Sequence, residues 1–454
     1  MNQQLIQKYN IPGPRYTSYP TVPYWEEENF SPEKWNASFI QSFEESNEKE
    51  GISLYIHLPF CESLCTFCAC NKRITKNHSL EKPYIDTVLK EWNLYLKTFK
   101  QKPIIKEIHL GGGTPTFFSV ESLQKLMNGI YENSIIHSER EFSFEGHPNN
   151  TTKEHLQCLY NLGFRRVSFG VQDYDEKVQK AINRIQPFEN VKKVTEWSRQ
   201  IGYESISHDL VFGLPFQSLE AVISTIEKTK SLQPDRLAFY SYAHVPWLKG
   251  NGQRGFEDKD LPNGEEKRIL YEKGKELLAE LGYFEIGMDH FAIESDSMYI
   301  SMKNNTLHRN FMGYTSSKTK LMIGLGVSSI SDSWYAFAQN EKELDTYQNQ
   351  IQKGELAVFR GHILSEKDLL IRKKILEIMC NLETELDTEF QQLAEYKMII
   401  ERIKEFEADS LLQLENNKLI VNELGRPFVR NICMAFDLRM LQKAPETRLF
   451  SLTV

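Results

Sequence analysis

The sequence predicts an α/β protein whose parallel sheet curves into a partly open barrel. Between residues 53 and 243, β-rich runs alternate with longer amphipathic stretches, and polar residues recur where those runs end. After residue 358 the pattern becomes mostly helical. The β-rich runs number six, which is too few to close the usual eight-stranded barrel, so we expect one side of the sheet to remain open.

Each predicted strand is short, and stretches with helical periodicity separate the strands. The six runs are SLYIHLPF (53–60), IIKEIHL (104–110), EFSFEG (141–146), RRVSFGV (165–171), SISHDLVFG (205–213) and RLAFYSY (236–242). Helical patterns occupy 84–99, 119–132, 152–161, 189–201 and 218–231. We therefore expect helices to cover the sheet.

Three regions are expected along the chain. Residues 1–35, rich in Pro and Tyr, are predicted to lie across the barrel opening, and 36–350 form the main domain, with further helix and strand signals at 260–345. Residues 358–454 are predicted to form a small, mostly helical terminal domain. It begins at a capping box, Ser365 to Asp368, continues with a helix over 388–408, and contains a winged hairpin at Asn416-Asn417.

Composition excludes several classes of partner. The chain has 454 residues and a formal net charge of -8, so it has no general attraction for phosphate backbones or anionic membranes. Its N-terminal stretch lacks the apolar core of a signal peptide, and no run approaches the roughly twenty apolar residues that span a bilayer. We expect a cytoplasmic monomer that binds neither nucleic acid nor membranes.

Polar residues follow or end all six predicted strands. Because the carboxyl ends of parallel strands meet at one mouth, we expect these residues to lie together. Each one alone has an ordinary explanation, such as a tight turn for the glycines or a structural hydrogen bond for the others. Their joint placement favours a ligand site. They are Cys61, Gly111 to Thr114, Glu145, Gln172, Asp209, Tyr242 and His244.

Four of the seven cysteines fall within ten residues, at Cys61, Cys65, Cys68 and Cys70. In a reducing compartment such a group indicates metal ligation rather than disulfides. A zinc site is one alternative, although zinc ligands are usually split between two separate knuckles. A closed iron-sulfur cluster on all four thiols would transfer electrons only, whereas three ligands would leave one iron open for chemistry.

The CxxxCxxC spacing after the first strand resembles the radical S-adenosylmethionine superfamily. This resemblance implies a partial (β/α)6 radical-SAM barrel in which Cys61, Cys65 and Cys68 hold a 4Fe-4S cluster. The open iron would bind S-adenosylmethionine, and one electron would cleave it to a 5'-deoxyadenosyl radical.

Nearly the whole chain resembles the family of oxygen-independent coproporphyrinogen III oxidases. A related haem chaperone shares the three cluster cysteines but characteristically lacks Cys70, the LHRNF segment and the RNIC terminus, all of which are present here. The matching segments include GPRYTSYP (13–20), CESLCTFCACN (61–71), GGGTPT (111–116), GVQD (170–173), DLVFGLP (209–215), YAHVP (242–246), GMDHFA (287–292), LHRNF (307–311), GLGVSSIS (324–331) and RNICMAFD (430–437).

The family pattern implies which residues bind the cofactor. The residues implied to contact S-adenosylmethionine are Tyr55, Phe67, Gly112, Gly113, Thr114, Glu145, Gln172, Arg184 and Asp209, with Ala243 and Ile330 at matching positions of the adenosine pocket. Two departures stand out. His147 occupies a position where Asp is usual, and Met312 follows LHRNF where Gln is frequent, which puts contacts to a second S-adenosylmethionine in doubt.

The resemblance further implies the reaction. Two propionate side chains of coproporphyrinogen III would be oxidised to vinyl groups with loss of carbon dioxide, giving protoporphyrinogen IX in haem biosynthesis. An electron donor and an acceptor are required but are not identified. The four substrate carboxylates need local cations, and the candidates in the family segments are Arg15, Arg309 and Arg430, with Lys72 and Arg73 nearby. The alternatives are a haem chaperone and a radical enzyme with another substrate.

Overall fold

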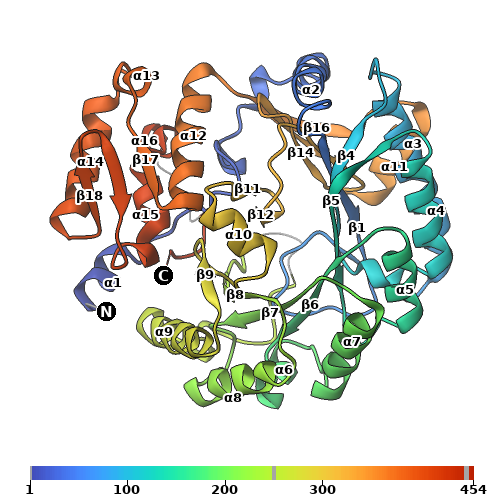
Figure 1. Ribbon diagram of the computed structural model, residues 1–454, viewed down its shortest axis with the longest axis horizontal. Helices are drawn as coiled ribbons and strands as arrows, with labels where there is room; N and C mark the ends of the chain where they lie inside the picture. The colour runs from blue at the N-terminus through green and yellow to red at the C-terminus, as the bar shows by residue number, and fades with distance from the viewer. Residues whose placement is uncertain (1–2, 248–251, 444–448, 454) are drawn as a thin grey trace.

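The computed structural model describes residues 3–247, 252–443 and 449–453. Its centre is a twelve-stranded sheet that curves into an open barrel, in the order β16-β15-β14-β13-β1-β4-β5-β6-β7-β8-β10-β9 (Figure 1). The six predicted strands are confirmed and pair in parallel as consecutive neighbours. They are β1 (Ile52–Leu58), β4 (Ile104–Gly112), β5 (Ile135–Gly146), β6 (Arg166–Gln172), β7 (Ser205–Phe212) and β8 (Arg236–Ser241).

The predicted helices are confirmed and lie on the outside of the curved sheet (Figure 1). Their apolar faces form a continuous core with the strands; Trp92 and Val88 of α3, for example, have no exposed surface. These helices are α3 (Glu81–Leu96), α4 (Val120–Tyr131), α5 (Lys153–Asn161), α7 (Phe188–Ile201) and α8 (Leu219–Lys230), with the shorter α6 (Glu176–Ala181) after β6.

Strands from later in the chain extend both edges of the parallel sheet. One of them, β13, pairs in parallel with β1, and the others are antiparallel to their neighbours. Counting βα repeats could not reveal them, because they are short and lack the repeat pattern. They are β13 (Met322–Leu325), β14 (Ile330–Asp332), β15 (Ala336–Asn340) and β16 (Val358–Ile363) at one edge, and β10 (His290–Ala292) and β9 (Phe284–Ile286) at the other.

Smaller elements complete this part of the chain. Those before the sheet or in its first loop are α1 (Gln3–Tyr9), α2 (Pro32–Ser46), β2 (Phe60–Cys61) and β3 (Arg73–Ile74). Those after β8 are α9 (Gly264–Glu280), α10 (Ser297–Lys303), the hairpin of β11 (His308–Asn310) and β12 (Gly313–Thr315), and α11 (Leu344–Lys353).

The C-terminal helices and hairpin form as predicted, with one exception. Helix α12 (Glu366–Asn381) begins at the Ser365 capping box, and the turn between β18 (Leu412–Glu415) and β19 (Lys418–Val421) has positive φ at Asn416 and Asn417. The remaining elements are β17 (Glu383–Glu385), α13 (Thr388–Gln391), α14 (Tyr396–Ala408), α15 (Val429–Met434) and α16 (Leu438–Gln442).

The prediction of one continuous helix over 388–408 is wrong. The chain turns at 392–395 between α13 and α14. Phe390 and Ile399 are both buried in the same core, but nine residues of α-helix would place them on opposite faces. The break lets both side chains point inward.

The first residues of the chain share a core with the last ones. Leu5, Ile6 and Tyr9 of α1 pack with the C-terminal helices, and Tyr9 stacks on Phe406 with ring centroids 5.1 Å apart. The N-terminal and C-terminal ends also run antiparallel at Pro12 and Leu452. Residues 5–19 therefore belong to the core of the C-terminal helices, and they lead on to the barrel opening.

Two of the three arginines expected to bind substrate hold this N-terminal segment instead. Arg430 is buried and donates to the carbonyls of Pro14 (2.9 Å), Gly13, Leu452 and Thr453. Arg309, also buried, donates to the carbonyls of Tyr16 at 3.3 Å and Arg15 at 3.2 Å. These contacts do not fit the expectation that Arg309 and Arg430 bind substrate carboxylates, because their guanidinium groups are occupied by backbone oxygens.

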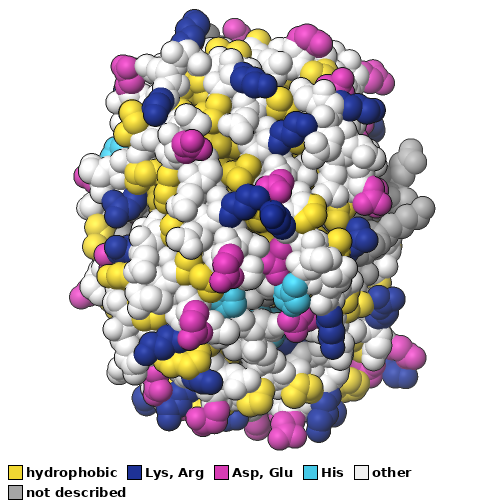
Figure 2. Space-filling model, turned by 90° about the vertical axis from the view of Figure 1, so that its right-hand side faces the viewer, with side chains coloured by type: hydrophobic (Ala, Val, Ile, Leu, Met, Phe, Trp, Pro, Cys, Tyr) yellow, Lys and Arg dark blue, Asp and Glu magenta, His cyan; other side chains and the backbone are white. Residues whose placement is uncertain are grey.

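Charges of both signs are interspersed over the face shown in Figure 2, which is the right-hand side of Figure 1. In the described part of the chain, no helix is both long and apolar enough to cross a membrane.

Replacing Arg430 is expected to loosen the N-terminal segment. An Arg430→Gln variant leaves four backbone carbonyls with fewer donors, at a cost of about 1–3 kcal/mol, so amide exchange in residues 10–16 should accelerate by about tenfold or more. Hydrogen exchange with mass spectrometry measures this. Arg430→Lys, which keeps the charge but not the fork of donors, should give an intermediate effect, and exchange in β1 should not change. Equal amide exchange rates for residues 10–16 in the wild type and the Gln variant would contradict the conclusion that Arg430 holds this segment.

Candidate active site

The parallel register of β1 and β4 brings the cysteine loop against the glycine turn. Leu58 pairs with Gly112, and beyond them Gly113 donates its backbone N–H to the Leu58 carbonyl at 2.9 Å. A Cβ atom on Gly113 would lie 2.6 Å from the backbone of Pro59, so no other residue fits without moving the chain. Gly112 has φ of +114°, which also favours glycine. Gly112 and Gly113 are therefore required by this close approach.

Hydrogen bonds also anchor the cysteine loop to the end of α6. Thr66 donates its amide to Ile182 and its hydroxyl to Ala181, both at 2.9 Å, and Asn183 donates to the Leu64 carbonyl at 2.7 Å. These bonds attach the loop to the end of α6, on the strand-end side of the sheet. The loop position is thus set by the barrel and not by the loop sequence alone.

One cavity of about 640 Å³ collects most of the predicted site residues, and we name it the thiol cavity. Its walls come from the carboxyl ends of the six parallel strands, as the sequence predicts. The predicted residues that line it are Arg15, Cys61, Cys65, Phe67, Cys68, Gly112, Gly113, Thr114, Glu145, Gln172, Arg184, Asp209 and Ala243.

The three predicted thiols lie in one cavity. Cys61, Cys65 and Cys68 all line the thiol cavity. Three thiolates could bind three irons of a 4Fe-4S cluster and leave the fourth iron open to a ligand in the cavity.

A hydroxyl group and a guanidinium group lie beside two of the thiols. Burial raises the pKa of the Cys61 thiol to about 11, so ligation there involves loss of a proton. The Cys61 sulfur lies 3.3 Å from the Thr114 hydroxyl, and Arg184 donates from Nη1 to the Cys65 sulfur at 3.6 Å. The positive Arg184 and the hydroxyl both favour thiolates at this position.

The thiol cavity also contains groups suited to a charged amino acid ligand. Arg184 donates through Nη2 to the Gly170 carbonyl at 2.7 Å, while its buried Nε has no hydrogen-bond partner. A carboxylate in the cavity would supply that partner. Burial raises the pKa of Asp209 to about 6, although a hydrogen bond of 2.7 Å from Ser168 favours its ionised form. The cavity therefore offers both a free donor and an acceptor.

A second cavity of about 1040 Å³, which we name the Tyr55 cavity, adjoins the first. Ala69, Cys70, Lys72, Gly112 and Glu145 line both cavities and form the strip between them. Cys70, whose role the sequence leaves open, thus lies on this boundary.

Two predicted cofactor residues line the Tyr55 cavity but not the thiol cavity. Tyr55 and Ile330 lie there, together with Met312, whereas Ala243 lies in the thiol cavity. Ala243 and Ile330 thus lie in adjoining cavities, one on each side of the boundary strip.

Several residues at the site carry no sequence signal. Gly252 donates its amide to the Cys68 carbonyl at 2.9 Å, and Gln253 bridges the Phe67 and Ala243 carbonyls at 3.1 and 2.8 Å. A glycine and a glutamine in a loop have no pattern that links them to a cluster.

Lys72, a predicted substrate cation, donates to the Cys68 carbonyl at 3.2 Å and to the Cys70 carbonyl at 3.1 Å. It lines both cavities and supports the loop.

Known proteins align with this chain over almost its full length. Residues 55–229 match the Radical SAM superfamily. The chain is 40% identical over 440 residues to an oxygen-independent coproporphyrinogen III oxidase from Helicobacter pylori strain J99, which covers 95% of each chain. It is 35% identical over 447 residues to the protein of the same name from Escherichia coli K12, covering 97% of this chain and 96% of that one.

A solved structure agrees with these relatives. Coproporphyrinogen III oxidase (HemN) from Escherichia coli, a radical SAM enzyme, superposes with a TM-score of 0.88 at 32% identity, covering 96% of this chain and 98% of that chain. The predicted partial barrel is confirmed by this match. The chain belongs to the family of oxygen-independent coproporphyrinogen III oxidases, within the radical SAM superfamily.

Proposed function

We propose that this enzyme converts two propionate side chains of coproporphyrinogen III to vinyl groups without oxygen, giving protoporphyrinogen IX in haem biosynthesis. The observation that supports this most is the thiol cavity, in which three clustered cysteines face the polar residues of the strand ends. The full-length relatives of that name give the substrate.

Cys61, Cys65 and Cys68 are proposed to hold a 4Fe-4S cluster, with S-adenosylmethionine bound beside it. When bound, the cluster and S-adenosylmethionine would supply a radical able to take hydrogen from the propionate β-carbon. Loss of carbon dioxide, and of one electron to an acceptor, would then leave the vinyl group, so no general base would be required. Its residues have to position the reactants and exclude water.

Arg184 and Asp209 are proposed to orient S-adenosylmethionine. The buried Arg184 Nε has no hydrogen-bond partner and could donate to a carboxylate, and Asp209 could accept from hydroxyl or amino groups. Gly113 leaves the backbone accessible, as a close ligand contact requires. Arg15, which is the one predicted substrate arginine that lines the thiol cavity, is proposed to meet a substrate carboxylate.

We further propose that the protein binds two molecules of S-adenosylmethionine, one in each cavity. Both cavities are large enough for a ligand of this size, and Gly112 and Glu145 line both, so a molecule in either can reach the boundary strip. Met312 lines the Tyr55 cavity with a thioether, which offers a ligand an apolar contact and no strong hydrogen bond.

Cluster assembly should depend on Cys65 and not on the isolated cysteines. Cys65→Ala removes one of three proposed ligands and should abolish the brown visible absorption of the anaerobically reconstituted protein. Cys158→Ala, a substitution remote from the cavity, should retain both colour and iron content. Retained colour in the Cys65 variant would disprove its assignment as a ligand.

Filling the Tyr55 cavity should remove one equivalent of bound S-adenosylmethionine. An Ile330→Trp variant places a larger side chain in that cavity, so equilibrium dialysis should give about one molecule per chain where the wild type gives about two. The cluster absorption should be unchanged. The matched control is Ile300→Trp at an exposed isoleucine, for which two equivalents are expected. One equivalent in the wild type would rule out the two-molecule proposal.

An anaerobic assay decides the reaction itself. With coproporphyrinogen III, S-adenosylmethionine and a chemical reductant, the wild type should release two molecules of carbon dioxide per vinyl porphyrin product, while Cys65→Ala should release none. Mass spectrometry of the oxidised porphyrin and trapping of labelled carbon dioxide measure both products. Protein with an intact cluster that forms no vinyl porphyrin would refute the proposal, and tight haem binding by the same preparation would identify a chaperone.

A further inference from the structure

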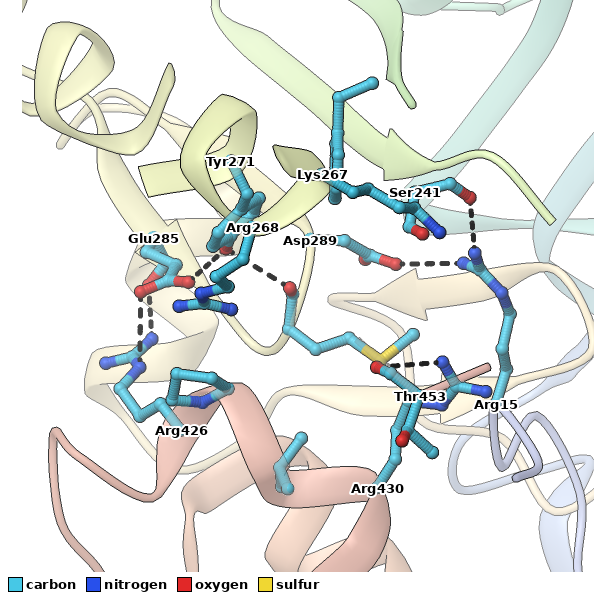
Figure 3. Close-up of a pocket in the computed structure, with 14 residues that line it drawn as sticks. Arg15, Ser241, Lys267, Arg268, Tyr271, Glu285, Asp289, Arg426, Arg430 and Thr453 are labelled. Atoms are coloured by element: carbon cyan, nitrogen blue, oxygen red, sulfur yellow. Dashed lines mark hydrogen bonds and ion pairs between the residues drawn. The ribbon is translucent and has the colours of Figure 1, made fainter. Parts of the chain in front are cut away.

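A small chamber of about 60 Å³ opens beside the thiol cavity, between α9, the turn that joins β9 to β10, and the C-terminal helices (Figure 3). Arg15 and Ser241 line both spaces, so they form the passage from one to the other. We name this space the side chamber. Besides Arg15 and Ser241, its polar lining comprises Lys267, Arg268, Tyr271, Glu285, Asp289, Arg426, Arg430 and Thr453.

The side chamber is cationic in a protein whose net charge is negative. Five of its lining residues carry a positive charge, at Arg15, Lys267, Arg268, Arg426 and Arg430, against two carboxylates. A concentration of like charges in a small, partly enclosed space is unfavourable unless counter-charges are present.

Both carboxylates already have several partners. Asp289 lies 2.7 Å from His290 and 3.5 Å from Arg15. Glu285 pairs with Lys275 at 2.6 Å and Arg426 at 3.3 Å. These two anions are engaged at the two ends of the chamber, as Figure 3 shows for the Arg15–Asp289 and Arg426–Glu285 pairs.

Two of the arginines are left without full compensation. Arg268 is 8% exposed and pairs with Glu272, yet its buried Nε has no hydrogen-bond partner. In Figure 3 its guanidinium group points into the space beside the Glu285–Arg426 pair. Arg430 donates to neutral carbonyls, and burial, with a smaller effect of Arg15, lowers its pKa to about 9. An anion in the chamber would satisfy the Arg268 donor and stabilise the charge of Arg430.

The size and position of the chamber define the anion. The chamber, at about 60 Å³, is far smaller than the thiol cavity of about 640 Å³, so it suits a small anionic group such as a carboxylate and not a whole tetrapyrrole. Because the chamber opens into the thiol cavity beside Arg15, its ligand can be one arm of a larger molecule in that cavity. Coproporphyrinogen III carries four such arms.

We propose that the side chamber binds the carboxylate of one substrate propionate, with Arg268 as the buried donor and Arg15 at the entrance. This inference rests on the proposed function. The contact fixes the position of the tetrapyrrole in the cavity, and Asp289, held by His290, positions Arg15 for it.

Binding of coproporphyrin III, the oxidised tetracarboxylate, to the reconstituted enzyme tests this proposal. Arg268→Gln should raise its Kd by about tenfold or more, because a charged hydrogen bond is lost. Glu272→Gln breaks the same surface ion pair but keeps the guanidinium group in the chamber, so its Kd should stay within about twofold of the wild type. Arg268→Lys should fall between them. Melting temperature and cluster absorption of each variant show that it is folded.

A second experiment distinguishes binding of the substrate carboxylate from binding of a free anion. Inorganic phosphate is titrated against melting temperature for the wild type and Arg268→Gln. A phosphate effect that depends on Arg268, with an unchanged coproporphyrin Kd, would show a free-anion site and overturn the propionate assignment. Equal losses in Arg268→Gln and Glu272→Gln would also overturn it. Failure of the proposed function would be distinct, since the wild type would then neither bind coproporphyrin III nor release carbon dioxide.

Discussion

The close contact between the β1 loop and the β4 glycine turn is the constraint on which the rest of the site depends. Leu58 and Gly112 are paired in the parallel register, and Gly113 reaches the backbone of Pro59 because it has no side chain. This contact turns the chain toward the strand-end rim just before Cys61. Glu145, Gln172 and Asp209 are placed at the same rim by the parallel register, since parallel strands end on the same side of the sheet.

The second organising feature is the use of buried arginines as clamps. Arg309 and Arg430 each bind backbone carbonyls of the N-terminal segment, although their positions in family segments favour a substrate role. A planar fork of donors can satisfy several carbonyls at once, which an ammonium group cannot do. The clamps hold Arg15 at the junction of the thiol cavity and the side chamber, so residues far from any cofactor set the geometry at the cavity wall.

The distribution of charge explains how an acidic protein can accept a tetracarboxylate. Some of its cations lie at interior surfaces, at Arg184 in the thiol cavity, Arg268 in the side chamber and Arg15 between the two. Inside the protein, a lower effective dielectric strengthens their interaction with an anion. Net charge by itself therefore says little about the ligand of an enclosed site.

Local periodicity and spacing in the sequence were sufficient to predict the six parallel strands, most of the helices and the cysteine loop. The sequence also placed the strand-end residues on one rim, since parallel pairing requires it. It could not decide the break at 392–395, the added strands β9, β10 and β13 to β16, or the separation of Ala243 from Ile330. Those depend on packing partners distant in sequence.

The roles of the arginines depend on contacts that form only in the folded chain. Arg15, Arg309 and Arg430 are alike as sequence signals, but Arg15 lines the thiol cavity, whereas Arg309 and Arg430 bind backbone carbonyls of the N-terminal segment. The side chamber is lined by residues from the N-terminal segment, α9, the β9–β10 turn and the C-terminal end. Its existence depends on where buried donors point after folding, which no local pattern encodes.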